Sequence, residues 1–195
     1  ITQSIVILPH FMSWTIVSML SVAILSANGV VNQLITMVGG KTIEFYNTPS
    51  VWPAILVILK VWQGAGFGSI VYLATITGID ASIYEAAAVD GASKTQCIFK
   101  VTLPMLKNTI IMLTIMSVGK IFNGDFGMIY AMVGSNSILY PTTDVIDTYL
   151  FRQLLENPSM GQTAAVGLIQ SILGFGFVVL CNKVANKWSP ESALF

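Results

Sequence analysis

The chain has 195 residues, of which 54% are hydrophobic and only 9% are charged, with 9 basic and 9 acidic side chains. Soluble domains carry about 25% charged residues, far more than this chain. The low charged fraction and the mean hydropathy of +0.77 together indicate an integral membrane protein. The lack of a basic patch argues against nucleic-acid binding. Two widely separated cysteines, Cys97 and Cys181, argue against a disulfide scaffold or a zinc site.

Four stretches are apolar over about 20 residues, the length that a helix needs to cross a bilayer. They cover residues 5–25, 51–76, 104–122 and 163–181. No internal repeat and no linker of biased composition divides them. The sequence therefore predicts an all-α fold, a polytopic transmembrane helical bundle in which residues 1–195 form a single domain.

The second predicted span contains a charged residue. Lys60 lies near its mid-depth, where a charge costs about 3 kcal/mol and is expected to face the bundle interior or water. Gln63 lies one helical turn further on, and Gly64 and Gly68 have the GxxxG spacing at which another helix could approach. Two interpretations of Lys60 stay open: a substrate-pathway residue, or a lysine that snorkels or forms a structural ion pair.

Between the second and third spans, residues 77–103 are predicted to form two short helices. Ser82 and Glu85 have the S-x-x-E form of a capping box, and Ser93 and Gln96 have the S-x-x-Q form. A glycine corner between the two should stop the first helix, because glycine adopts the left-handed conformation that ends helices.

The first of these helices is rich in small side chains. Glu85 is followed by alanines at 86–88, which extend a helix easily and let another surface approach its backbone. Leu103 and Pro104 then start the third span, since proline is tolerated in a first turn. From the spacing alone, the loop is equally an interfacial cover for the bundle or a docking site for another protein.

Residues 123–162 form the longest connection. Thr143 or Asp144 can cap a helix there, and three apolar residues then share one helical face: Ile146, Leu150 and Leu154. We interpret this amphipathic helix as a lid over the outer end of the bundle, in preference to a partner site.

Polar and aromatic side chains in or beside the spans are the candidates for a substrate pathway. A sugar needs hydrogen-bonding groups and an aromatic face, although amides such as Gln170 in the fourth span also join helices structurally. No motif fixes the candidates, which are Lys60, Trp62, Gln63, Asn123 and Gln170.

Lysine and arginine in the connections predict the orientation in the membrane. Residues 26–50 and 123–162 hold only Lys41 and Arg152. The loop at 77–103, the start of the third span and the C-terminal tail hold Lys94, Lys100, Lys107, Lys183 and Lys187. The loop and both visible termini are therefore predicted to be cytoplasmic.

The loop also carries a family signature. Glu85-Ala86-Ala87, Gly91, Val101 and Leu103-Pro104 resemble the EAA-x3-G-x9-I-x-LP pattern of ABC-transporter permeases, with valine in place of isoleucine. Asp90, before the glycine, is similar to the sugar-permease version. The stretches at 8–14 and 143–149 resemble oligosaccharide permeases of the lipoprotein-and-polysaccharide-uptake branch.

The resemblance implies a type I ABC importer permease in a bacterial cell membrane, with further spans before Ile1. It implies that the loop is a coupling helix docked on a cytoplasmic ATPase. The contact would be made by Glu85, Ala86, Ala87, Asp90 and Gly91, and the exit of the loop would be fixed by Leu103 and Pro104.

The implied partners are two ATPase subunits, a second permease subunit and an extracytoplasmic solute-binding protein that delivers an oligosaccharide. ATP and magnesium would be bound by the ATPases, so this chain is expected to need no cofactor, metal or catalytic residue of its own. It would be a transport subunit and not an enzyme.

Other functions stay open. The same machine could import another solute, such as a peptide or polyol, or the chain could be a scaffold whose loop docks an unrelated partner. A membrane enzyme would have to use Lys60 or His10, without an acid/base constellation or a G-x-S-x-G motif. Gly40-Lys41-Thr42 ends like a phosphate-binding loop, but Ile35 stands where that pattern needs glycine.

Overall fold

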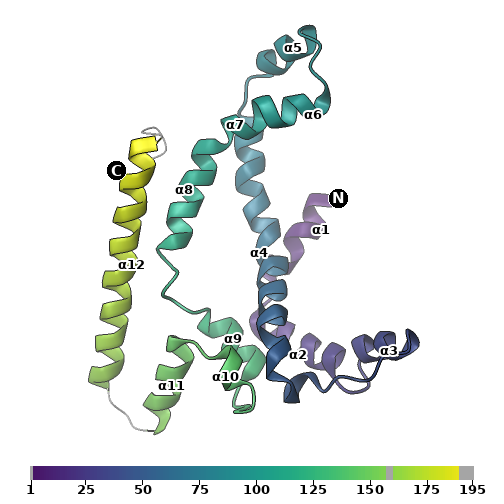
Figure 1. Ribbon diagram of the computed structural model, residues 1–195, viewed down its shortest axis with the longest axis vertical. Helices are drawn as coiled ribbons and strands as arrows, with labels where there is room; N and C mark the ends of the chain where they lie inside the picture. Colours follow the sequence, from purple (N-terminus) through teal and green to yellow (C-terminus); the bar gives the residue numbers. More distant parts are fainter. Residues whose placement is uncertain (1, 157–159, 189–195) are drawn as a thin grey trace. The chain divides into compact units, whose positions relative to one another are not determined.

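The computed structural model describes residues 2–156 and 160–188, and every regular element within them is a helix (Figure 1). The all-α prediction is confirmed. In chain order the helices are α1 (Thr2–Ile7), η1 (Leu8–Phe11), α2 (Trp14–Leu25), α3 (Val30–Met37), η2 (Phe45–Asn47), η3 (Pro49–Val51), α4 (Trp52–Thr77), α5 (Ala81–Val89), α6 (Lys94–Cys97), η4 (Ile98–Thr102), α7 (Leu103–Met105), α8 (Lys107–Val118), α9 (Phe126–Val133), α10 (Tyr140–Thr143), α11 (Ile146–Glu156) and α12 (Met160–Trp188).

Three helical stretches are long and apolar enough to cross a membrane: Trp14–Met37, Pro49–Thr77 and Gly161–Lys187. A fourth is present if the segment Lys94–Met105 and α8, which are bent by 54° relative to each other, count as one span. In the most apolar window of each of the three, at most 17% of the residues are buried. So much exposed apolar surface suits a lipid environment.

The first span differs from the predicted helix at 5–25. A 3₁₀ turn with Pro9 at its start interrupts that stretch, and α2 begins at Trp14 because the Ser13 hydroxyl accepts the Ile16 N–H at 3.3 Å. The apolar stretch then continues through α3 to Met37. A proline and a good N-cap residue therefore end one helix and start the next within an apolar sequence.

The third span also differs from the predicted helix at 104–122. The bend of 54° lies between α7 and α8, and α8 ends at Val118, before turns at 119–122. Pro104 has no N–H and its ring clashes with the carbonyl four residues earlier. The turn before it, η4, is a π-helix, which is a common site of helix distortion.

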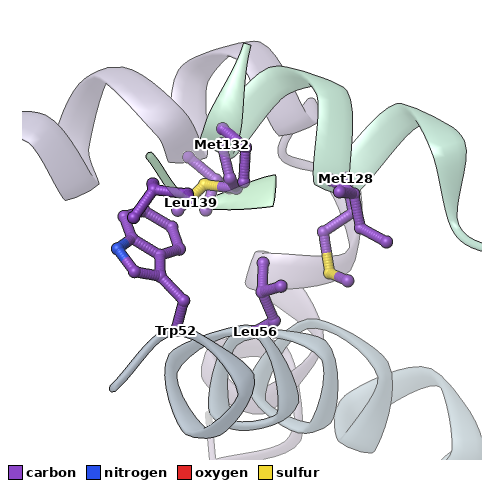
Figure 2. Packing of buried hydrophobic residues seen from close by; sticks show 8 residues of the cluster. Trp52, Leu56, Met128, Met132 and Leu139 are labelled. Atoms are coloured by element: carbon purple, nitrogen blue, oxygen red, sulfur yellow. The ribbon is translucent and has the colours of Figure 1, made fainter. Parts of the chain in front are cut away.

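The described residues fall into two compact units, which we describe separately. Unit 1 is Ile1–Gly66 with Asn123–Thr163, and unit 2 is Phe67–Phe122 with Ala164–Phe195. Figure 2 shows the core of unit 1, where Trp52 and Leu56 of α4 meet Met128 and Met132 of α9 and Leu139.

Side-chain hydrogen bonds to backbone groups 6 to 11 positions away complete unit 1. The Trp52 indole N–H donates to the Phe45 carbonyl at 2.7 Å. Buried Asn32 donates from Nδ2 to the carbonyls of Ser26 and Ile43, at 3.0 and 2.9 Å, and its Oδ1 accepts the Ile43 N–H at 2.8 Å. One amide therefore holds the irregular segment after α3 in place.

Glycine lets α4 approach α1 closely, although not at the predicted positions. A Cβ added at Gly64 or Gly68 would meet no atom within 4 Å. At Gly66 it would collide with the Val6 carbonyl group and lie 2.8 Å from the Ile7 Cα. The close approach therefore uses the glycine between the two of the GxxxG pattern.

In unit 2, the end of α8 packs against α12. A Cβ at Gly174 would lie 2.8 Å from the Gly119 carbonyl oxygen. Beside this contact, the Gln170 amide donates to the Phe122 carbonyl at 2.8 Å, and the rings of Phe122 and Phe177 meet edge to face at 5.3 Å. Small residues and one amide thus join these helices, as is typical in membranes.

Candidate functional site

The connecting loop, residues 77–103, begins with a helix cap two residues earlier than predicted. Asp80 is the N-cap of α5, and its Oδ1 accepts the Ser82 N–H at 2.9 Å. That hydrogen bond lowers the pKa of Asp80. The prediction that Ser82 caps this helix is therefore wrong, because a carboxylate just before it satisfies the helix end.

The corner of the connecting loop is a left-handed glycine, as predicted. Gly91 has φ +75°, the Ala92 N–H donates to the Ala87 carbonyl at 2.9 Å, and the Gly91 N–H donates to the Ala88 carbonyl at 3.0 Å. These two bonds form the Schellman motif that ends helices. Nothing lies within 4 Å of a Cβ at Gly91, so backbone conformation and not space requires glycine there.

The second short helix has the predicted capping box. The Ser93 hydroxyl accepts the Gln96 N–H at 3.3 Å, and the Gln96 side chain accepts the Ser93 N–H at 2.7 Å. A bond between the hydroxyls of Tyr84 in α5 and Thr102 in η4, at 3.0 Å, joins the first helix to the turn that follows the second. The connecting loop is thus a defined helix–glycine–helix motif.

The connecting loop exposes most of its signature residues on the surface. Ala87 and Val101 are half-buried, whereas the other signature residues are exposed: Glu85, Ala86, Asp90, Gly91, Leu103 and Pro104. Large apolar side chains are exposed beside them, including Val89 at 88% and Phe99 at 63%. Small, apolar and acidic groups therefore share an open surface that another protein could cover.

The five substrate-pathway candidates lie in different surroundings. Gln63 donates to the Met12 carbonyl at 3.0 Å in unit 1, and Gln170 makes its backbone contact in unit 2. Each amide therefore joins a long helix to a non-helical segment. Trp62 and Asn123 are exposed, and Lys60 lines a cavity in unit 1.

Lys60 has a partner that the sequence did not identify. Its ammonium forms an ion pair with Asp125 and lies 5.8 Å from the centre of the Trp14 ring. Asp125 is also the N-cap of α9, where its Oδ1 accepts the Met128 N–H at 3.2 Å. An acid directly before the apolar run of α9 is the one sequence signal that could have placed this carboxylate.

A second ion pair in unit 1 joins Arg152 to Asp144. The guanidinium binds both carboxylate oxygens, with Nη1 to Oδ1 at 3.0 Å, and lies 3.9 Å over the Tyr140 ring. Burial acts to raise the pKa of Asp144, but hydrogen bonds from Arg152 and Thr148 outweigh it and the pKa is lowered. The hydrogen bond to Asp144 raises the pKa of Arg152.

The cavity beside Lys60 has a volume of about 360 Å³. Its wall is mostly apolar, with one ammonium, two hydroxyl groups and one carboxylate. The lining residues are Pro53, Leu56, Val57, Lys60, Val61, Met128, Ile129, Thr142, Thr143, Asp144 and Val145.

The fold and the connecting loop define the class: a polytopic, all-helical membrane protein with an exposed helix–glycine–helix loop between two spans. The chain belongs to the family of binding-protein-dependent transport system inner membrane components, which matches residues 1–188. It is therefore a multi-pass inner-membrane protein of a transport family. The resemblance to ABC-transporter permeases is confirmed at this level.

Individual relatives and a solved structure agree with the family. The polygalacturonan/rhamnogalacturonan transport system permease protein YteP of Bacillus subtilis is 33% identical over 190 residues, covering 97% of this chain and 59% of the relative. The arabinooligosaccharides transport system permease protein AraP of Halalkalibacterium halodurans is 30% identical over 154 residues, or 77% of this chain and 47% of the relative. The chain thus spans about half the length of these relatives.

The structure of a bacterial alginate ABC transporter, in complex with an alginate pentasaccharide-bound periplasmic protein, contains a similar chain. The two superpose with a TM-score of 0.89 at 35% identity, covering 96% of this chain and 65% of that one. The fold is therefore that of an ABC importer permease.

Proposed function

We propose that this chain is a permease subunit of an ATP-driven importer, and that it moves an oligosaccharide delivered by an extracytoplasmic binding protein. The observation that carries the proposal is the exposed loop with the Glu85–Pro104 signature in a chain of this family. Relatives named for polygalacturonan and arabinooligosaccharides, and the alginate transporter, support a saccharide as cargo. Alternating access by rigid-body rocking would carry it across.

The connecting loop would dock on a cytoplasmic ATPase, one of two that bind ATP and magnesium, beside a second permease subunit. Ala86 and Ala87 allow close approach to the backbone of α5, and exposed Val89 would be buried on docking. Gly91 sets the angle between α5 and α6. Movement of the ATPase would be transmitted through the segment Lys94–Met105 to α8. The segment and α8 meet at an angle of 54°.

The lysines support this orientation. Lys94 and Lys100 are exposed on the loop, and Lys183 and Lys187 are exposed near the end of α12. Positive side chains stay on the cytoplasmic side of bilayers. The loop and both visible ends of the chain are therefore proposed to be cytoplasmic.

The test replaces Gly91 in the complete transporter, reconstituted with its binding protein. A bulky residue must leave φ +75°, so Gly91→Trp misdirects α5 and α6. ATP-dependent saccharide uptake should fall by about tenfold or more, within the range of coupling free energies between sites. Membrane insertion and thermal stability should stay unchanged, because the site is open.

The chain offers a matched control. Gly39 also has a positive φ, +82°, with nothing within 4 Å of an added Cβ. It lies in the connection at 26–50, outside the connecting loop at 77–103. Gly39→Trp introduces the same backbone strain and should retain uptake. Normal uptake by Gly91→Trp, or equal loss in both variants, would overturn the coupling role and favour a scaffold.

A further inference from the structure

We propose that the cavity beside Lys60 binds a sugar unit through its carboxylate, so that the cargo is an acidic oligosaccharide. This inference rests on the proposed import function and names the class of its substrate. It follows from the contrast between the two ion pairs of unit 1.

Lys60 can accept a second anion. Its side chain is 56% exposed, that of Asp125 is 28% exposed, and a lysine ammonium has three N–H donors. Exposed single-point ion pairs contribute little to stability. A carboxylate from a ligand can therefore join or replace Asp125 at little cost.

Asp125 keeps other stabilising contacts when Lys60 turns to a ligand. Its Oδ1 accepts the Met128 N–H at 3.2 Å, at the N-terminus of α9. Negative charge is favoured at that end of a helix. The exchange of one carboxylate for another at Lys60 thus leaves no isolated charge behind.

The other acid at the cavity does not repel an anion strongly. Asp144 is neutralised by the two-point ion pair with Arg152, which is in turn fixed over Tyr140. Arginine in such a planar pair does not exchange as readily as a lysine point charge. Lys60 is therefore the cation of this cavity that can bind a new partner.

The rest of the cavity suits a sugar ring. Its volume of about 360 Å³ lies within the range of small-molecule sites, which starts near 300 Å³. Apolar Leu56, Val57 and Ile129 face the C–H surface of a ring. The hydroxyls of Thr142 and Thr143 donate to backbone carbonyls at 2.7 and 2.9 Å, so their oxygens can still accept from sugar hydroxyls.

The similar proteins are consistent with such a ligand. Galacturonan, in the name of the relative at 33% identity, is a polymer of a sugar acid. Alginate is an acidic polysaccharide, and its transporter contains the chain at 35% identity. These similarities supply the choice of test ligand.

The experiment measures equilibrium binding of trigalacturonate to the purified complete transporter without its binding protein, against the fully methyl-esterified trisaccharide. The ester has the same ring structure and no charge. Wild type should prefer the acid, and Lys60→Gln should weaken binding of the acid by about tenfold, the equivalent of one charge-assisted contact. Binding of the ester should change less than about twofold.

Lys41→Gln is the matched control, because it removes one exposed positive charge from the connection at 26–50, away from the residues that line the cavity. It should leave both affinities unchanged. Equal weakening of acid and ester by Lys60→Gln, or no binding of the acid by wild type, would overturn the inference.

Uptake measured in parallel separates the two proposals. Normal ATP-dependent uptake of a saccharide without acid preference at Lys60 would leave the import function standing and overturn the acidic cargo. Lys60-dependent binding of the acid without ATP-dependent uptake would support the site and overturn the import function.

Discussion

The connecting loop at 77–103 and the core of unit 1 are stabilised by opposite kinds of hydrogen bond. In the loop, the bonds that shape each helix end join residues two to five positions apart, such as Asp80 with Ser82 and Ala87 with Ala92. In unit 1, the Asn136 side chain reaches the Tyr46 carbonyl, 90 positions away. The ends of the loop helices are therefore stabilised by residues close in sequence, whereas the unit 1 core depends on packing between distant segments.

The largest effect on stability is expected at Asn32, in the core. Asn32→Leu removes three hydrogen bonds and leaves the Ile43 N–H without its partner. The free energy of unfolding should fall by about 3 kcal/mol, measured by thermal unfolding in detergent. Transport per folded molecule should be retained.

The neighbouring amide is its control. Gln33 is exposed and makes one bond, to the Asn28 carbonyl at 2.9 Å. Gln33→Leu should change the free energy of unfolding by less than about 0.5 kcal/mol. Similar losses in both variants would show that the core is no more dependent on its long-range bonds than an exposed helix face is.

The Arg152–Asp144 pair should give a smaller effect that depends on pH. Asp144→Asn should lower the free energy of unfolding by about 2 kcal/mol at pH 7, since a partly buried arginine loses its partner. The pKa of Asp144 is lower when folded, so the pair stabilises above the unfolded pKa of about 3.9 and this is lost as pH falls through the folded pKa. The difference between wild type and variant should therefore shrink below about pH 4.

Glu156→Gln removes an exposed acid from the same helix, α11, and serves as the control for charge alone. It should change stability by less than about 0.5 kcal/mol at either pH. A difference between wild type and Asp144→Asn that persists at low pH would assign the effect to packing and not to the ion pair.

In the loop, loss of a cap should act locally. Ser93→Ala removes one half of the capping box and should destabilise α6 by about 1 kcal/mol, which raises amide hydrogen exchange there about fivefold. Thermal unfolding of the whole protein should not change. Ser82→Ala should leave exchange in α5 unchanged, because Asp80 is the cap. Faster amide exchange in α5 after Ser82→Ala would show that Ser82 caps this helix, as its sequence predicts.

The sequence predicted what depends on local pattern. The left-handed Gly91, the Ser93 capping box and apolar stretches long enough to span a membrane follow from composition and short spacings. The structure contains three such stretches, or four if the bent pair that includes α8 counts as one. The choice between Asp80 and Ser82 as a cap depends on where α4 ends, which apolar periodicity does not specify. The pairing of Lys60 with Asp125, 65 positions apart, depends on how α4 packs against α9. Such pairings are set by tertiary packing, which local sequence patterns do not specify.

The smallest effect on stability is expected at Tyr46, and its sign tests most directly whether the core of unit 1 and the connecting loop depend on different kinds of contact. The Tyr46 hydroxyl is buried with no hydrogen-bond partner among the described residues, burial raises its pKa, and its ring packs edge to face on Trp52 at 5.0 Å. Tyr46→Phe keeps the ring and removes the unsatisfied group, so the free energy of unfolding should rise by up to about 1 kcal/mol. In the loop, Tyr84→Phe loses the bond to Thr102 and should speed amide exchange in α5 without altering thermal unfolding. A lower stability of Tyr46→Phe would show that this hydroxyl is hydrogen-bonded in the folded protein, and that the core of unit 1 contains one more long-range contact than the described residues account for.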